Sequence, residues 1–300
     1  MILVTGANGQ LDSATLAALH SRGAFATGGS RAPSDGMRRL DFDDPAGIDL
    51  TGVSTLVLIS AGYAEDDQVI GRHAAVLDAA VRDGVRHVVY TSLTGAGDHL
   101  AFALAHRATE QLVRACGLPW TILRNGLYAE LFGGLLMWAD HGVEVAFGDG
   151  ALAAVPRADL ADAAAIIAAD PAHHNGRTYD LTGTPITAAQ VADRLGVPHR
   201  TIGVGEYRGR PLDEMPELLP FQPPMLVSIA TGIRHGERYN RILAEGLLYA
   251  CTWLSEDQRR EALAVWNIHY NYHRPHGTTE GQPPASRLRD GVTNVLASYS

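Results

Sequence analysis

The chain opens with the stretch ILVTGANGQLD, residues 2–12, in which an apolar, strand-like run leads directly into a turn that contains Gly6 and Gly9. A first strand, a glycine turn and a helix begin a βαβ unit. In such a unit the turn lets the backbone approach a pyrophosphate, and the helix N-terminus supplies free N–H groups and partial positive charge. We therefore predict a dinucleotide-binding turn. Its backbone contacts are expected from the following residues: Gly6, Ala7, Asn8, Gly9, Gln10 and Leu11.

The third glycine expected in such a turn is replaced by Asp12. That glycine normally permits close packing of the helix on the strand, and an acid in its place puts negative charge near the phosphates. Two interpretations follow from this substitution. One is a working dinucleotide site, and the other is a nucleotide-binding fold with a degraded pocket.

Apolar runs alternate with amphipathic helical patterns along the chain after this turn. Continuous apolar runs are typical of parallel strands buried on both faces, and their alternation with helices predicts an α/β fold with a Rossmann-like, doubly wound parallel sheet. The expected strands are 2–5, 24–27, 55–59, 87–91 and 120–123, and the expected helices are 10–22, 67–83 and 101–116. Further helices and short strands after Arg124 predict a small C-terminal lobe on the substrate side, which reaches about Gly236.

The composition excludes several classes of protein. The 300-residue chain has a formal charge of −9, and all 24 of its Lys and Arg residues are arginine. The acidic balance does not favour nucleic acid or an anionic membrane as a partner. The lack of lysine excludes a Walker-A loop, Schiff-base chemistry and a Tyr-x-x-x-Lys pair. Two distant cysteines, no apolar run of about 20 residues and no signal peptide lead us to expect a cytoplasmic protein without a membrane segment or a metal site.

The end of the second strand indicates which dinucleotide binds. The sequence there is GGSR, and it contains no acid to accept the ribose 2′-hydroxyl. Ser30 and Arg31 could instead receive a 2′-phosphate, which favours NADPH over NADH. In the alternative interpretation, Arg31 is a solvated loop residue. Asp41 and Phe42 are expected to flank the adenine.

Six motifs, taken in order along residues 1–236, resemble the NmrA-like branch of atypical short-chain dehydrogenases, and NADPH:quinone oxidoreductases in particular. The motifs are TGANGQL (5–11), LDFDDP (40–45), LVLIS (56–60), VVYTSLTGA (88–96), HRATEQLVRACGLPWTILRNGLYAE (106–130) and YDLTG (179–183). The resemblance implies a Rossmann domain that binds NADP(H), and a cleft between this domain and a small C-terminal lobe.

Candidate site residues follow the strands of the expected sheet. Thr91 and Ser92 lie at the carboxyl end of the strand expected at 87–91, where ligands bind in open α/β sheets, so we expect them to face the nicotinamide; otherwise they only terminate the strand. Ser60, at the end of the LVLIS motif, is a further cofactor-binding candidate. Tyr128, in the segment that resembles the family's cleft wall, is a candidate catalytic residue that would stack on a flat acceptor, although core tyrosines are common.

The acid–base pair of extended short-chain dehydrogenases is missing. Their Tyr, Lys and Glu at i, i+4 and i+8 are replaced by Phe102, His106 and Glu110. Phe102 cannot donate a proton, which disfavours ketone reduction. A quinone needs less help, because the hydroquinone anion is delocalised and can take its proton from solvent or a histidine. His106 is thus a candidate catalytic residue, and the alternative is a structural histidine on the helix.

Residues 237–300 differ from the rest of the chain. They carry seven arginines and seven acids, and the motifs HYNYHRPHG and QPPASRL resemble the C-terminal end of DDE-type insertion-sequence transposases with an integrase core. The two aspartates and the sheet that such a transposase needs would have to precede Glu237, where a Rossmann domain is expected instead. We predict a mostly helical, poorly ordered tail, the result of an insertion element that interrupts an oxidoreductase gene.

Three functions follow from these observations. The first is an NADPH-dependent oxidoreductase that transfers hydride to a quinone or a similar electron-poor aromatic, impaired to some degree by Asp12 and the tail. The second is a non-catalytic NADP(H)-binding regulator or redox sensor. The third and most remote is a transposase fragment that acts in DNA integration. The expected partner is a small acceptor molecule rather than nucleic acid or a membrane, and a homodimer is the candidate assembly.

Overall fold

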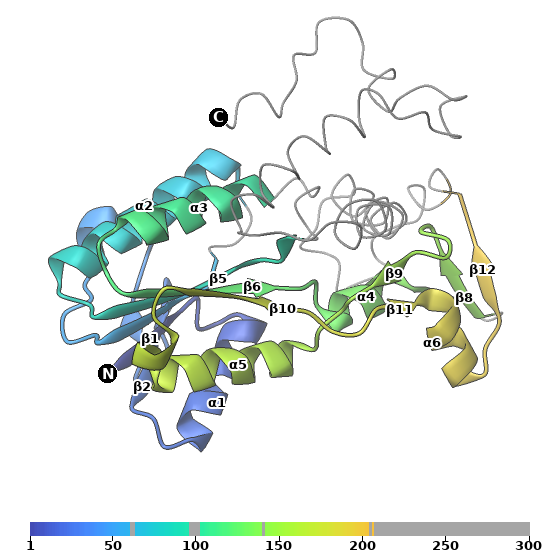
Figure 1. Ribbon diagram of the computed structural model, residues 1–300, viewed down its shortest axis with the longest axis horizontal. Helices are drawn as coiled ribbons and strands as arrows, with labels where there is room; N and C mark the ends of the chain where they lie inside the picture. The colour runs from blue at the N-terminus through green and yellow to red at the C-terminus, as the bar shows by residue number, and fades with distance from the viewer. Residues whose placement is uncertain (61–63, 96–102, 140–141, 204–205, 207–300) are drawn as a thin grey trace, which may run out of the picture. The chain divides into compact units, whose positions relative to one another are not determined.

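Figure 1 shows the computed structural model, which describes residues 1–60, 64–95, 103–139, 142–203 and 206. The chain divides into two units, Met1–Glu237 and Arg238–Ser300. The helices expected in the tail and the candidate residue Phe102 lie outside the described residues.

A seven-stranded sheet forms the centre of the first unit (Figure 1). Its order is β10-β6-β5-β4-β1-β2-β3, and every neighbouring pair in it is parallel. The strands are β1 (Ile2–Thr5), β2 (Ala26–Ser30), β3 (Arg38–Arg39), β4 (Thr55–Leu58), β5 (His87–Leu93), β6 (Trp120–Asn125) and β10 (Arg177–Leu181). All residues of β1, β4 and β5 are buried, as expected for strands that are covered on both faces.

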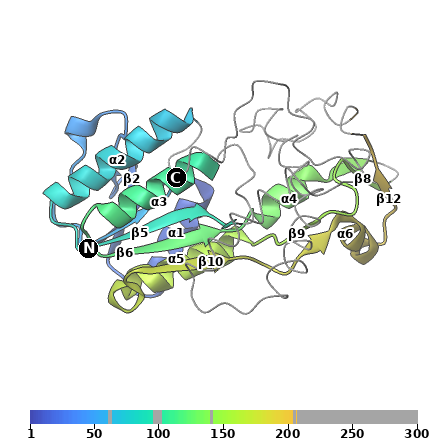
Figure 2. The ribbon, with the colours of Figure 1, turned by 45° about the horizontal axis from the view of Figure 1, so that its top comes forward.

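Helices cover both faces of this sheet (Figures 1 and 2). On one face, α1 (Gln10–Ser21) packs against α5 (Arg157–Ala169) over an apolar core that includes Val4, Val57 and Val89. On the other face, α2 (Asp66–Arg82) packs against α3 (Ala103–Ala115). The Rossmann-like, doubly wound α/β fold that the sequence predicts is therefore confirmed.

The expected elements agree closely with those observed. The first strand begins and ends where predicted. The helices expected at 10–22 and 101–116 each end one residue earlier, and the one expected at 67–83 begins and ends one residue earlier. Positions 101 and 102 lie outside the described residues. The second strand was placed two residues too early, because its glycines, Gly28 and Gly29, lack the apolar side chains that mark a buried strand. No bounds were predicted for the two-residue strand β3, which precedes Asp41.

A small lobe follows β6. It contains α4 (Ala129–Leu135), α6 (Ala188–Leu195), β9 (Ala151–Leu152) and β11 (Ile186–Thr187), together with a sheet of β7 (Met137–Ala139), β8 (Gly142–Val145) and β12 (His199–Thr201). Phe132 and Phe147, whose ring centroids are 5.6 Å apart, lie in its apolar core. Two 3-10 turns complete the described elements: η1 (Pro45–Gly47) and η3 (Pro171–His174).

One expectation about this lobe was wrong. From the sequence, we expected everything after Arg124 to belong to this lobe, whereas α5 packs on α1 and β10 pairs with β6 in the main sheet. The physical reason lies in the packing of α5. Its buried side chains, mostly alanines such as Ala164 and Ala165, let it approach α1 closely and complete the layer on that face.

Candidate functional site

The sheet reverses its direction of growth at β1. The chain proceeds from β1 to β2 and β3 on one side and then to β4, β5 and β6 on the other. In open α/β sheets, ligands bind outside the carboxyl ends of the strands at such a point. Thr5 joins the two strand ends there, because its Oγ1 accepts a hydrogen bond from the N–H of Ile59 (2.9 Å) and donates one to the Ile59 carbonyl (3.3 Å).

The predicted glycine turn lies directly after β1. Gly6 has a φ of +71°, which L-residues with a side chain rarely adopt. Ala7 donates a backbone hydrogen bond to the Gly29 carbonyl (3.0 Å), so the turn lies against β2. A Cβ on Gly28 would overlap the side chain of Ala7. This approach explains why β2 carries glycine where a buried strand normally carries a branched residue.

Asn8 connects the turn to the end of β2. Its side-chain amide donates to Ser30 Oγ (2.8 Å) and to the Ala32 carbonyl (3.0 Å). Gln10 and Leu11 begin α1, with Leu11 buried and Gln10 exposed. The structure therefore brings the cofactor candidates of the turn and of β2 together.

The residues expected at the ribose and adenine lie beside β2 and β3. Arg31 is exposed directly after Ser30, and its carbonyl accepts a hydrogen bond from Arg39 Nη1 (3.3 Å). Arg39 was not among the site residues expected from the sequence, although it directly follows another basic residue in the chain. Asp41 Oδ2 lies 3.9 Å from Arg39 Nη2, and Phe42 packs against the core between the sheet and α2.

Asp12 lies in the first turn of α1 with only 7% of its surface exposed. A Cβ added to Gly6 would lie 2.9 Å from Asp12 Oδ2, and a Cβ added to Gly9 would overlap the same oxygen. Burial raises the pKa of Asp12 to about 7, against the opposing effect of hydrogen bonds from the backbone N–H groups of Gly9 and of Asp12 itself. The carboxyl group thus occupies the inner side of the glycine turn.

A second group of polar side chains lies where β4 and β5 end. Thr91 Oγ1 accepts a hydrogen bond from the Ser60 N–H (3.2 Å). The buried Tyr90 hydroxyl lies 3.0 Å from His106 Nδ1. Burial raises the pKa of Tyr90, although hydrogen bonds with Thr109 and Ser60 lower it in part. Tyr90 was missed by the sequence analysis, because an inward-facing tyrosine in an apolar strand gives no functional signal.

His106 is neutral in this environment. Burial, followed by the positive charge of Arg107, lowers its pKa to about 4. His73 Nδ1 lies 2.8 Å from Thr109 Oγ1, and burial lowers the pKa of His73 to about 3. At neutral pH both imidazoles therefore have one N–H donor and one acceptor nitrogen.

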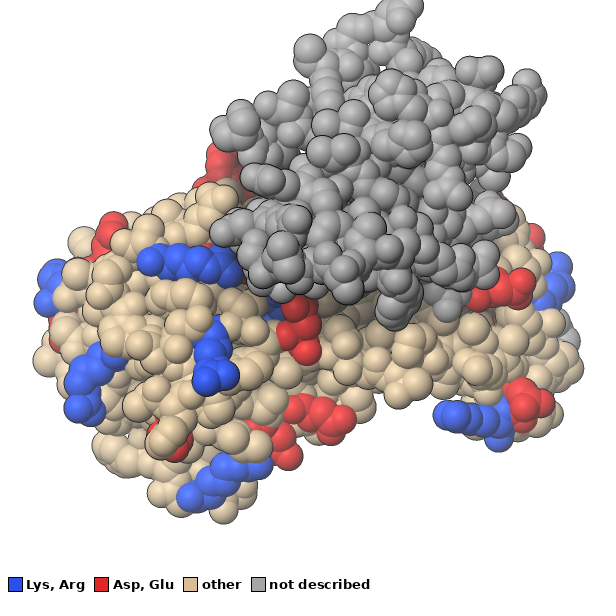
Figure 3. Space-filling view, in the orientation of Figure 1, with Lys and Arg blue, Asp and Glu red and all other residues tan. Residues whose placement is uncertain are grey.

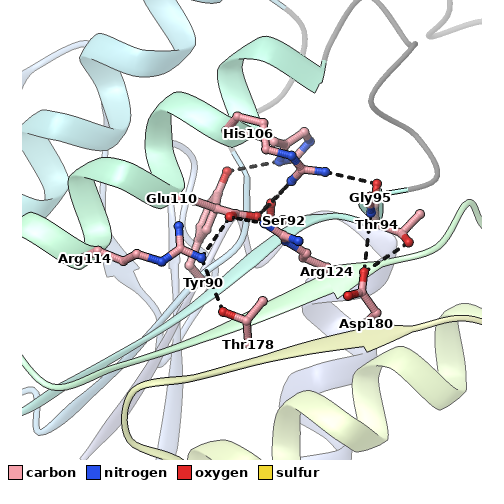
Figure 4. Close-up of polar contacts among 11 residues, drawn as sticks. Tyr90, Ser92, Thr94, Gly95, His106, Glu110, Arg114, Arg124, Thr178 and Asp180 are labelled. Carbon is pink, nitrogen blue, oxygen red and sulfur yellow. Dashed lines mark hydrogen bonds and ion pairs between the residues drawn. The ribbon is translucent and has the colours of Figure 1, made fainter. Parts of the chain in front are cut away.

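Glu110 is surrounded by three arginines and Ser92 (Figure 4). Arg124 makes a bidentate pair with it (2.8 and 2.8 Å), Arg107 and Arg114 approach to 2.8 and 3.1 Å, and Ser92 Oγ donates at 2.7 Å. Burial would raise the pKa of Glu110, but the hydrogen bonds from Arg124 and Ser92 and the nearby positive charges outweigh burial and lower the pKa to about 2.

This cluster changes the interpretation of Ser92. The sequence analysis expected Ser92 to face the nicotinamide together with Thr91, but its hydroxyl points to Glu110 and also accepts from Arg107 Nη1 (3.2 Å). Adjacent residues of a strand point to opposite faces, so Thr91 and Ser92 cannot serve the same face. The nicotinamide contact of Thr91 remains a proposal.

Two more polar groups lie at the ends of β6 and β10. Asp180 accepts hydrogen bonds from Thr94 Oγ1 (3.2 Å) and the Gly95 N–H (3.4 Å), as Figure 4 shows. Asn125 is buried, and its Oδ1 has no hydrogen-bond partner among the described residues. A buried acceptor without a partner at the carboxyl end of a strand is suited to a ligand N–H or O–H.

Tyr128 lies where the Rossmann core meets the small lobe. Its ring packs against the apolar cores of both parts. The guanidinium carbon of Arg157 lies 4.7 Å from the centre of the ring. Tyr128 also precedes α4, and it forms an isolated parallel bridge with Val155.

The residues of this site fit a dinucleotide at most positions. The glycine turn, the α1 N-terminus and Ser30 supply N–H and O–H donors where a diphosphate and ribose would lie. The exception is Asp12, which fits the diphosphate in its neutral form and repels it when ionised. In the described part of the chain, no three His, Cys, Asp or Glu side chains are grouped closely enough to hold a metal ion.

Comparison with known families agrees with this geometry. Residues 6–171, more than half of the chain, match the family described as NAD(P)H-binding. The chain belongs to the NAD(P)H-binding family. The match begins at Gly6, in the turn after β1, and the sequence-based expectation of an NmrA-like, quinone-oxidoreductase-type protein is confirmed.

Individual proteins are similar to this chain in sequence and in structure. Quinone oxidoreductase 2 of Escherichia coli is 35% identical over 212 residues, which cover 65% of this chain and 73% of the relative. An NADPH-dependent quinone oxidoreductase of Escherichia coli, crystallised with NADPH, superposes with a TM-score of 0.67 at 27% identity, covering 89% of this chain and 100% of that one. The triphenylmethane reductase of Citrobacter sp., crystallised with NADP(H), gives 0.69 at 26% identity, covering 86% and 94%.

The C-terminal part of the chain matches a different family. Residues 235–284 match the integrase core domain, which confirms that an NAD(P)H-binding sequence is joined to transposase-like sequence. The structure describes no residue after Glu206, so the expected boundary near residue 236 stays a prediction.

Proposed function

We propose that this protein is an NADPH-dependent reductase of quinones or similar electron-poor aromatics. The arrangement around His106 carries the proposal. Near the carboxyl end of β5, where short-chain dehydrogenases need a proton donor, the chain has a neutral histidine hydrogen-bonded to a buried tyrosine. The sequence similarity to a quinone oxidoreductase supports the same acceptor class.

The preference for NADPH rests on the end of β2. Ser30 is positioned by Asn8, and the two exposed arginines Arg31 and Arg39 lie beside it. A phosphate monoester carries a charge of −1.5 to −2 near pH 7, so two guanidinium groups favour the 2′-phosphate over a 2′-hydroxyl. Two relatives were crystallised with NADPH or NADP(H), which supports this assignment.

The bound dinucleotide supplies a hydride to the acceptor. Addition of a hydride to a quinone gives a hydroquinone anion, and one proton completes the reduction. The anion is delocalised, so a strong acid is not needed and solvent can supply the proton. This chemistry suits a site whose histidine has a pKa of about 4.

His106 is the candidate donor of a hydrogen bond to the acceptor oxygen. Tyr90 keeps its proton at neutral pH, because burial raises its pKa. When Tyr90 donates this proton to His106 Nδ1, the imidazole proton lies on Nε2. Tyr90 would then act as a positioning residue that fixes the tautomer and the orientation of His106.

The second candidate function is a non-catalytic NADP(H) sensor. It is favoured by the lack of a strong proton donor, because Phe102 replaces the tyrosine of extended short-chain dehydrogenases and His106 is neutral. Metal-dependent DNA integration is not supported, because acids and arginines are interspersed on the described surface in Figure 3. On a separate point, no helix among the described residues is long and apolar enough to cross a membrane. A homodimer and a cytoplasmic location stay predictions.

Steady-state oxidation of NADPH with a panel of quinones tests the proposal. We expect turnover with quinones, little or none with simple ketones, and a lower rate with NADH. A protein that binds NADPH tightly but oxidises it with none of the quinones would support the sensor instead. A reaction without protein measures background reduction, and a matched His106→Gln variant tests the role of the imidazole, because it retains a polar side chain without the ring.

A further inference from the structure

The Asp12 carboxyl group lies inside the glycine turn, where an anionic ligand group would bind. Its Oδ2 lies where side chains of Gly6 and Gly9 would be, so the carboxyl group fills the inner side of the turn. Gly9 is the N-cap of α1 and has no side chain to cap the helix. The Asp12 carboxylate accepts a hydrogen bond from the Gly9 N–H instead. A dinucleotide's diphosphate uses the same N–H groups and the same positive end of the helix.

The elements packed around Asp12 carry few other charged side chains. The residues of β1, of the turn and of β2 carry no titratable side chain. On α5, which packs against α1, the charged side chains are Arg157, Asp159 and Asp162, and Asp162 is paired with Arg22 of α1 (3.2 Å). His20 lies in the last turn of α1. None of these groups contributes to the shift of the Asp12 pKa, which burial dominates.

We propose that Asp12 couples dinucleotide binding to the uptake of one proton. The carboxyl group is neutral when the diphosphate lies in the turn and ionised when the turn is empty at alkaline pH. This inference rests on the proposed function, because it concerns the same dinucleotide site. It assigns a role to a residue that otherwise only weakens the site.

The coupling has a defined sign. The pKa of Asp12 is already raised to about 7 in the free protein, and a neighbouring diphosphate raises it further. Above pH 7 the free protein loses the proton while the complex keeps it. The affinity therefore falls by as much as tenfold per pH unit above pH 7, and it levels off below pH 7. By linkage, binding above pH 7 consumes up to one proton per site.

The test is a titration of the full chain with NADPH between pH 7 and pH 9, followed by cofactor fluorescence. This window lies above the second pKa of the 2′-phosphate, which is about 6, so that group does not titrate. Calorimetry at pH 8 in two buffers with different ionisation enthalpies counts the protons taken up. The variants are Asp12→Asn and Asp12→Gly, with Asp159→Asn as the control that removes an exposed first-turn acid from α5.

For the wild type and Asp159→Asn we expect Kd to rise steeply with pH and a proton uptake close to one. For Asp12→Asn and Asp12→Gly we expect a Kd that is independent of pH, at least tenfold lower than wild type at pH 9, and no proton uptake. Equal affinity and equal pH dependence for all four proteins would overturn the inference and leave the proposed function intact. If none binds NADPH at any pH, the proposed function fails as well. If the Asp12 variants do not fold, the wild-type proton count decides alone.

Discussion

The side-chain amide of Asn8 donates a hydrogen bond of 2.8 Å to Ser30 Oγ. This bond joins the glycine turn after β1 to the end of β2, 22 residues further along the chain. In the proposed complex, the turn binds the diphosphate and Ser30 faces the 2′-phosphate. Asn8 therefore sets the distance between two parts of one ligand site.

We expect Asn8→Ala to weaken NADPH binding by about five- to tenfold, because loss of a hydrogen bond of about 1 kcal/mol frees the end of β2. Since Asn8 is exposed and its side chain contacts the end of β2, the KM for NADPH should rise while kcat changes little. Steady-state kinetics measure both. A fall in kcat with an unchanged KM would contradict this positioning role.

Arg31→Ala and Arg39→Ala test the preference for NADPH. Each charged hydrogen bond to a phosphate contributes about 1.5–3 kcal/mol, so each variant should raise the Kd for NADPH by roughly 10- to 100-fold. The Kd for NADH should stay nearly constant, because NADH has no 2′-phosphate. Fluorescence titration with both dinucleotides gives the selectivity, and an unchanged ratio would remove these arginines from the site.

Stability should depend on pH through Asp12. Its folded-state pKa of about 7 lies above the ordinary value of 3.8, so the folded protein loses stability as pH rises between these two values. Asp12→Asn removes this loss. It should stabilise the protein at pH 8 by up to about 4 kcal/mol and much less near pH 4. Urea unfolding of the wild type and of Asp12→Asn at both pH values measures this gain in stability. The gain should be larger at pH 8 than near pH 4.

Substitution of the buried Glu110 should destabilise the fold far more than substitution of an exposed acid. The variant Glu110→Gln removes the negative charge and leaves Arg107, Arg114 and Arg124 close together without a counter-charge. This should lower the free energy of unfolding by about 3–5 kcal/mol. Asp162→Asn, which removes an exposed ion pair with Arg22, should cost less than about 1 kcal/mol. Chemical unfolding compares the two variants, and similar losses would refute the role of burial.

The contribution of Glu110 to folding stability changes with pH in the opposite direction to that of Asp12. Its pKa is lowered to about 2, so its contribution to stability is complete above its ordinary value of 4.5 and is lost as pH falls toward 2. Acid unfolding of the wild type should therefore steepen below pH 4.5. The same region should be flatter in Glu110→Gln.

The sequence predicted the sheet well, because buried parallel strands such as β1 and β5 are continuous apolar runs. It also identified the glycine turn, whose residues are adjacent in the chain. The cluster around Glu110 was not predicted. Arg107 and Arg114 lie at helical spacing from Glu110, but Arg124 and Ser92 come from different strands, and only the fold brings them together. A single sequence carries no signal for such a long-range contact.

The return of β10 to the main sheet was missed for a related reason. The strand has exposed polar residues such as Arg177 and Thr178, so it lacks the apolar run of a buried strand. It lies at the edge of the sheet, where it pairs with β6 on one side and with none of the described strands on the other. Sequence patterns identify central strands better than edge strands for this reason.

In the proposed function, the turn after β1 binds a dinucleotide despite Asp12. Calorimetric titration of the full chain with NADPH at pH 6.5, where Asp12 is largely neutral, tests this claim most directly. We predict saturable heat with a stoichiometry near one per chain and weaker binding of NADH. No heat with either dinucleotide at pH 6.5, for the wild type and for Asp12→Gly alike, would contradict the account.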